Sequence, residues 1–164
     1  KKPLVISTVD IAEAKEYVIT NCAPKDNLKD NYITEIEVGK AVRASSSFPA
    51  FFCPCEFKNH IFMDGGVLDN TPVLPLKQIC DKKIIAVNFE SDSVGEDCDV
   101  MDVIMKSLDI MGNKISEKSF EQSDLILTIP TDGAGLFDID KLDKCYQFGY
   151  NTVMRNLKKF RDLL

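Results

Sequence analysis

Short runs of apolar, mostly β-branched residues alternate along this chain with segments in which apolar side chains recur every three or four positions. Runs of the first kind predict strands, and the second spacing predicts amphipathic helices. Their alternation predicts an α/β fold class. The predicted strands cover residues 4–9, 17–20, 61–63, 83–89 and 125–129, and the predicted helices cover residues 35–44, 71–79, 100–118 and 139–163.

Local signals refine three of these elements. Thr34 and Glu37 have the spacing of a capping box, which places a helix start near Glu35. The strand at 83–89 is almost continuously apolar, as expected of a parallel strand covered on both faces. In the helix at 100–118 the apolar stripe predicts a face packed in the core, with its methionines as core filler; the stripe consists of Met101, Ile104, Leu108, Met111 and Ile115.

Composition describes one soluble globular domain over residues 1–164, because 45% of the residues are hydrophobic and 28% are charged. The net charge of −6 argues against nucleic acid as a partner and against a polybasic lipid anchor. The longest uncharged run, residues 44–55, is too short to be a transmembrane segment, so membrane contact would be transient. We expect a cytoplasmic protein.

The six cysteines lack the spacing of a disulfide framework, so we expect them to be reduced. Cys53 and Cys55, followed by His60, have the ligand types of a zinc site. They lack the two-residue gap and a fourth ligand, so we reject that interpretation and expect no metal.

The strongest candidate for chemistry is Asp64, which follows a predicted strand and precedes Gly65 and Gly66. A carboxylate becomes a useful general base only when it is positioned and partly desolvated, and two glycines permit a sharp turn with close backbone packing. Asn70 is predicted to fix the following loop through hydrogen bonds to the backbone. An ordinary Asp-Gly turn is the alternative for Asp64 taken alone.

A second motif precedes this turn. Residues 41–49 read Ala-x-x-Ala-Ser-x-x-x-Pro, and the Asp-Gly-Gly turn is followed by Asn70 and Pro72. In this combination the chain resembles the carboxy-terminal part of the patatin-like phospholipase family. The resemblance implies a three-layer α/β/α domain with a mainly parallel sheet. It also implies a serine–aspartate dyad that hydrolyses lipid acyl esters without a cofactor, with Asp64 as the dyad base.

The nucleophile of such a dyad belongs on a Gly-x-Ser-x-Gly elbow, and this sequence contains none. Ser45, Ser46 and Ser47 follow a predicted helix and lack flanking glycines, so we reject them as nucleophiles. We expect the serine in an amino-terminal part of the same protein, because a chain that starts in mid-sheet leaves a strand edge uncovered. The alternative is a noncatalytic patatin-like module that binds lipid or a protein partner.

Three weaker patterns each have a functional and a structural interpretation. His60 could complete a Ser-His-Asp triad with Asp64, but its polar surroundings indicate a solvated turn. Asp138, Asp140 and Asp143 resemble a calcium loop without its glycine, and a helix cap explains them better. Aromatic residues before Asp64 either line an acyl channel or interfacial lip, or fill the core; they are Phe48, Phe51, Phe52 and Phe57.

Overall fold

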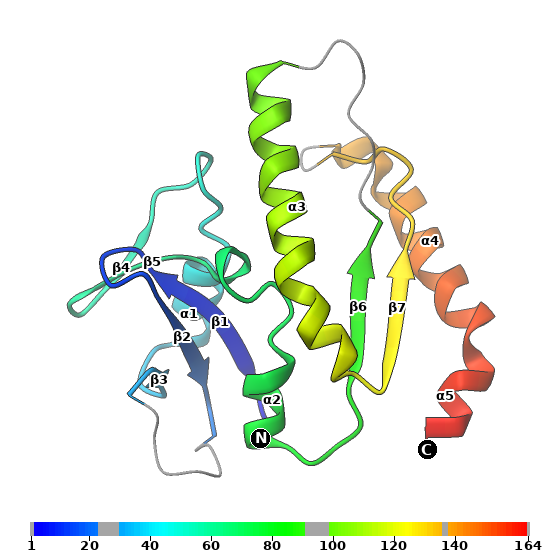
Figure 1. Ribbon diagram of the computed structural model, residues 1–164, viewed down its shortest axis with the longest axis horizontal. Coiled ribbons are helices and arrows are strands. Elements are labelled where there is room, and N and C mark those ends of the chain that lie inside the picture. Colours follow the sequence, from blue (N-terminus) through cyan, green and yellow to red (C-terminus); the bar gives the residue numbers. More distant parts are fainter. Residues whose placement is uncertain (1, 23–29, 91–98, 136–137, 164) are drawn as a thin grey trace. The chain divides into compact units, whose positions relative to one another are not determined.

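The computed structural model describes residues 2–22, 30–90, 99–135 and 138–163 (Figure 1). The chain forms two compact units. Unit 1 comprises Lys1–Lys82 and Ile110–Gln122, and unit 2 comprises Lys83–Asp109 and Ser123–Leu164. Strands and helices occur in both, so the predicted α/β class is confirmed.

Unit 1 is built on a five-stranded sheet with the order β3-β2-β1-β5-β4. Its strands are β1 (Val5–Asp10), β2 (Lys15–Thr20), β3 (Tyr32–Ile33), β4 (Cys55–Phe57) and β5 (His60–Asp64).

Most pairings in this sheet are antiparallel, which corrects the prediction of a mainly parallel sheet. The reason lies in the connections. Residues 11–14 join β1 to β2, and residues 58–59 join β4 to β5. Connections this short form hairpins, whereas parallel neighbours need a crossover of a dozen or more residues. Within this sheet only β2 and β3 pair in parallel.

Strand β1 lies in the centre of the sheet, between β2 and β5. Both sides of the first strand are therefore paired. The edges of the sheet are instead β3 and β4, of 2 and 3 residues. Edges this short offer little template for pairing with another chain.

Helix α1 (Val38–Ser45) covers one face of this sheet and buries Ala41 and Ala44. It begins three residues later than the capping-box pattern predicted, because Glu37 makes no side-chain cap and Glu35 pairs with Lys58 instead. The core beneath it consists of Tyr17, Ala44, Cys55 and Phe62.

Unit 2 contains a parallel pair, β6 (Ile85–Phe89) and β7 (Leu125–Ile129). Asp124 joins the two strands at their start, since its carboxylate accepts hydrogen bonds from the Ile84 amide at 2.9 Å and from Lys83 at 2.8 Å. The strand at 83–89 was predicted to be covered on both faces. In the structure, exposed and buried positions alternate along β6 and β7, so one face of each strand is exposed. The long predicted helix at 139–163 is divided into η2 (Ile139–Lys141), α4 (Leu142–Arg155) and α5 (Leu157–Leu163).

Helix α3 (Val100–Glu121) confirms the predicted element, but a different face is buried. Its buried residues are Gly112, Ser116 and Ser119. Met101 and Met111 are 43% and 53% exposed, so they do not fill the core. A Cβ atom at Gly112 would be in ordinary contact, at 3.7 Å, with the Asn70 side-chain nitrogen.

Helix α2 (Val73–Ile79) follows the Asp64 loop and starts two residues later than predicted. Within the described part of the chain, no helix has both the length and the apolar composition required to cross a membrane.

Candidate active site

Asp64 is the last residue of β5, opposite Thr8 on the central strand β1. Its amide donates a hydrogen bond to the Ser47 carbonyl at 3.1 Å. The Thr8 hydroxyl donates to the carbonyl of Met63 at 2.7 Å. Backbone and side-chain hydrogen bonds from two other segments therefore fix the end of β5, as a precisely held catalytic group requires.

The Asp64 side chain turns back over the loop that follows it. One carboxylate oxygen accepts a hydrogen bond from the Gly66 amide at 2.8 Å, which caps the short helix η1 (Gly65–Val67). Burial raises the pKa of Asp64 above its ordinary value of 3.8, and the Gly66 hydrogen bond opposes that shift in part. A carboxylate with a raised pKa is a stronger base than a solvated one.

Gly65 has no room for a side chain. A Cβ atom there would lie 2.5 Å from the Ser7 carbonyl oxygen, which belongs to the backbone and cannot rotate away. At Gly66, a Cβ atom would lie 3.0 Å from the Asn70 amide oxygen and 3.1 Å from the Asp64 carboxylate. The two glycines thus let the Asp64 loop pack directly against β1 and against Asn70.

A cavity of about 320 Å³ opens in unit 1 beside this loop. All four residues predicted for the site line it, namely Asp64, Gly65, Gly66 and Asn70. The cavity meets the carboxyl end of β5 but the amino-terminal half of β1, because the two strands are antiparallel.

Sequence reasoning missed two further polar residues on the cavity, Ser7 and Asp69. The Ser7 hydroxyl donates to Glu16 at 3.2 Å. Burial raises the pKa of Asp69, and the Thr71 amide opposes that shift. The sequence did offer a signal for Asp69, because it lies five residues after Asp64 in the same motif. Ser45, rejected as a nucleophile, also lines the cavity.

Arg43 secures the loop that leads from α1 towards β4. Its guanidinium donates to the Ser47 hydroxyl and, at 2.7 Å, to the Cys53 carbonyl. The Ser47 hydroxyl in turn donates to the Arg43 carbonyl at 2.8 Å. Since the Ser47 carbonyl accepts the Asp64 amide, this clamp also supports the candidate base.

His60 lies at the start of β5 and Asp64 at its end. The His60 ring nitrogen Nδ1 is 2.7 Å from a carboxylate oxygen of Asp10, whose side chain is 1% exposed. The ring stacks on Phe62 with centroids 5.2 Å apart. His60 is thus a partner of Asp10, and its interpretation as part of a solvated turn is corrected.

Asp10 also accepts hydrogen bonds from the amides of Ala12 and Glu13, at 2.8 and 3.2 Å. Burial is the largest single influence and raises its pKa, but the hydrogen bonds from His60 and the two amides outweigh it and hold the pKa below 3.8. A lowered carboxylate pKa stabilises the fold above the unfolded-state value and loses that contribution as the pH falls through the folded-state value.

We therefore expect Asp10→Asn to lower the free energy of unfolding by about 2 kcal/mol at pH 7, since it removes a buried, charge-assisted interaction. The deficit should shrink as the pH falls below the unfolded-state value of 3.8 and through the lowered pKa of Asp10 in the folded protein. Urea denaturation at pH 7 and pH 3 measures both values. An equal deficit at both would show that the charge of Asp10 does not stabilise the fold.

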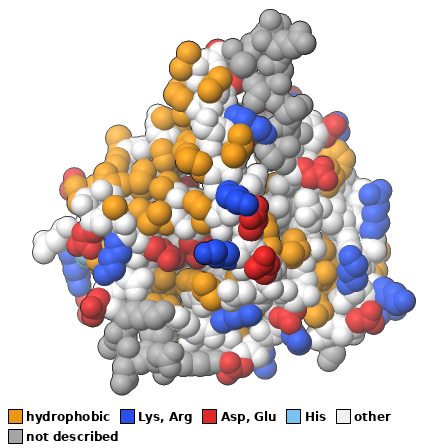
Figure 2. Space-filling view, viewed as in Figure 1, with side chains coloured by type: hydrophobic (Ala, Val, Ile, Leu, Met, Phe, Trp, Pro, Cys, Tyr) orange, Lys and Arg blue, Asp and Glu red, His pale blue; other side chains and the backbone are white. Residues whose placement is uncertain are grey.

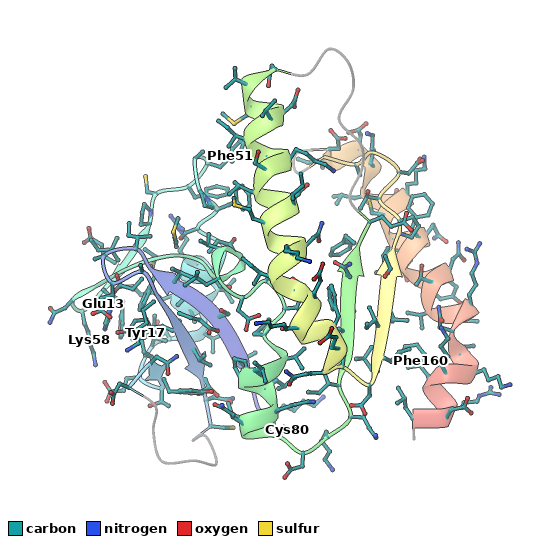
Figure 3. All side chains as sticks on the ribbon, viewed as in Figure 1. Glu13, Tyr17, Phe51, Lys58, Cys80 and Phe160 are labelled. Atoms are coloured by element: carbon teal, nitrogen blue, oxygen red, sulfur yellow. The ribbon has the colours of Figure 1, made fainter. Side chains whose placement is uncertain are left out.

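Among the described residues, one group could hold a metal ion: ligand atoms of Asp10, Glu13 and His60 lie within 4.8 Å of one another. Each has a protein partner already. Glu13 accepts a hydrogen bond from the Tyr17 hydroxyl at 2.7 Å, a pair labelled in Figure 3. The group is therefore a closed hydrogen-bond cluster at the turn between β1 and β2.

The other patterns considered for metals have structural explanations. Cys55 is buried in the core while Cys53 is exposed, and neither belongs to the group above. Asp138 pairs with Lys141 at 2.7 Å and accepts a hydrogen bond from the Gly135 amide at 3.1 Å, so it organises the loop before α4.

The Asp-Gly-Gly turn thus lies at a strand end of unit 1, beside a polar cavity. Residues 6–77 match the family model described as patatin-like phospholipase. The match covers just under half of the chain, in the segment that contains Asp64, both glycines and Asn70, and it supports the predicted resemblance to the patatin-like phospholipase family.

Proposed function

We propose that this chain supplies the catalytic aspartate of a serine hydrolase that cleaves acyl esters of phospholipids or lysophospholipids. Asp64 is the general base. The observation that carries the proposal is a half-buried carboxylate with a raised pKa, fixed at a strand end on a polar cavity within the family-matched segment. Perturbed carboxylates in clefts are typical of acid–base catalysts.

The nucleophile comes from a Gly-x-Ser-x-Gly segment that this sequence does not contain. In the proposed reaction, Asp64 takes the serine hydroxyl proton as the serine oxygen attacks the ester carbonyl. The proton then passes to the departing alcohol, which leaves an acyl-serine. Asp64 next takes a proton from water, whose oxygen attacks the acyl carbonyl. As the bond between the carbonyl carbon and the serine oxygen breaks, Asp64 returns this proton to the serine oxygen, and the fatty acid is released.

The other residues of the cavity have supporting roles in this proposal. Gly65 and Gly66 allow the close approach of the Asp64 loop to β1, and Asn70 packs over Gly66. Donors for the oxyanion would come from the segment that carries the serine.

We expect the 164-residue chain alone to be inactive towards a nitrophenyl ester, because a base without a nucleophile or an oxyanion hole has nothing to activate. The complete gene product should hydrolyse the ester and should be labelled by a fluorophosphonate at a serine outside residues 1–164. The Ser45→Ala variant is the matched control, since Ser45 lines the same cavity.

Two results would contradict this proposal. Fluorophosphonate labelling of the chain alone that disappears in Ser45→Ala would place the nucleophile within this sequence. A complete gene product that is neither labelled nor active would favour the noncatalytic module.

A further inference from the structure

The loop between α1 and β4, residues 46–54, contains three phenylalanines and no charged residue. Phe52 is 52% exposed. Phe51, labelled in Figure 3, lies 6.0 Å from Phe48 between ring centroids. On the left of Figure 2, hydrophobic side chains gather over the part of unit 1 to which this aromatic loop belongs.

The aromatic loop has a defined conformation. The amides of Phe51 and Phe52 donate to the Phe48 carbonyl at 3.3 and 3.1 Å, and Ala50 adopts a positive φ of 69°. The Arg43 clamp ties the far end of the loop through the Cys53 carbonyl. A turn held in this way presents an aromatic side chain without a large ordering cost on binding.

The aromatic loop is also continuous with the candidate site. Ser47, its second residue, accepts the hydrogen bond from the Asp64 amide. Ser45, the residue directly before the loop, lines the Asp64 cavity. The acyl ester of a phospholipid lies at the boundary between headgroups and chains, so a hydrolase that attacks it has to work at that surface.

We propose that the aromatic loop seats this protein on a zwitterionic phospholipid surface, with Phe52 entering the boundary between headgroups and acyl chains. The choice of a lipid as the occupant rests on the proposed function. Apolar burial supplies the attraction, since the loop has no charge and the chain has a net charge of −6, which repels anionic lipid.

The absence of tryptophan from the sequence makes a direct test possible. In Phe52→Trp, the single indole reports its own surroundings. We expect phosphatidylcholine vesicles to shift its emission to shorter wavelength. Leu74→Trp is the matched control, because Leu74 on α2 is 48% exposed but lies outside the loop, and its emission should stay unchanged.

Phe52→Ser should lower partitioning into the same vesicles about tenfold in a sedimentation assay, the scale expected when one partly buried phenylalanine is lost. Leu74→Ser should leave it unchanged. Asp64→Asn should bind vesicles as wild type does, so that loss of catalysis and loss of membrane binding are separate results. Circular dichroism verifies that each variant is folded.

Several outcomes would overturn the proposal. One is an unshifted Phe52→Trp emission in the presence of vesicles. A second is binding that requires anionic lipid. A third is emission that is already at short wavelength without vesicles, together with a dimer in light scattering, which would show that a second copy covers the loop.

Discussion

Replacing Asp64 by asparagine is expected to lower kcat on an acyl ester by a factor of about 100 or more in the complete gene product, the usual scale for loss of a general base. Asparagine keeps the oxygen that accepts the Gly66 amide, so the loop should remain in place. Only the ability to take a proton is lost.

The same substitution should stabilise the fold. Since burial raises the pKa of Asp64, its contribution to stability is fully present below the unfolded-state value of 3.8 and is lost as the pH rises through the folded-state value. At neutral pH the ionised carboxylate therefore destabilises the protein. We expect Asp64→Asn to raise Tm by roughly 2–4 °C at pH 7, after allowance for partial solvent screening.

Asp69→Asn is the matched control for this experiment. Asp69 lines the same cavity, and burial raises its pKa in the same direction. Its replacement should change Tm similarly and leave kcat within a few-fold of wild type. Scanning calorimetry at pH 3 and pH 7 measures Tm, and the Tm gain of either variant should vanish at the lower pH. A dead Asp69→Asn enzyme beside an active Asp64→Asn enzyme would assign the base to Asp69.

Gly65→Ala is expected to destabilise the protein by about 3 kcal/mol, because the added methyl group would lie 2.5 Å from the backbone carbonyl of Ser7. The Ser7 oxygen belongs to the backbone, and the backbone also fixes the position of a Cβ atom, so no side-chain rotation relieves the contact. Either β1 or the Asp64 loop must move, and either movement displaces the candidate base.

Gly39→Ala makes the same chemical change but is expected to stabilise the protein. Gly39 lies in α1, and a Cβ atom there would meet nothing within 4 Å. Alanine is a better helix former than glycine, so this variant should gain up to about 1 kcal/mol. Urea midpoints at an unchanged m value compare the two variants. A Gly65→Ala protein as stable as wild type would show that β1 and the loop are not in the close contact described.

Local pattern predicted much of the secondary structure of this chain. The strand at 125–129 has its predicted bounds, and the helix expected at 100–118 ends only three residues later. Runs of β-branched residues and three-to-four spacing are properties of neighbouring residues, so they can be read from one sequence. Helix starts were less accurate: Glu37 makes no side-chain cap, and the helix predicted to start near Glu35 starts at Val38.

The sequence was a poorer guide to which helix face is buried and to which distant residues form hydrogen bonds with each other. The apolar stripe of α3 indicated which face would be buried, yet the buried positions are Gly112, Ser116 and Ser119. Backbone approach decides such a contact, and hydrophobicity does not report it. His60 and Asp10 are 50 residues apart in sequence, and only the antiparallel pairing of β1 with β5 brings them together.

By itself the sequence determined the Asp-Gly-Gly turn, its position after a strand and the absence of a serine elbow, because each is a matter of residue type and spacing. The tertiary structure decided how the strands pair, since the pairing depends on hairpin connections and not on apolar content. It also decided the environment of Asp64. Burial raises the pKa of Asp64, and the residues around its cavity include Ser7 and Ser45, which are distant from Asp64 in the sequence.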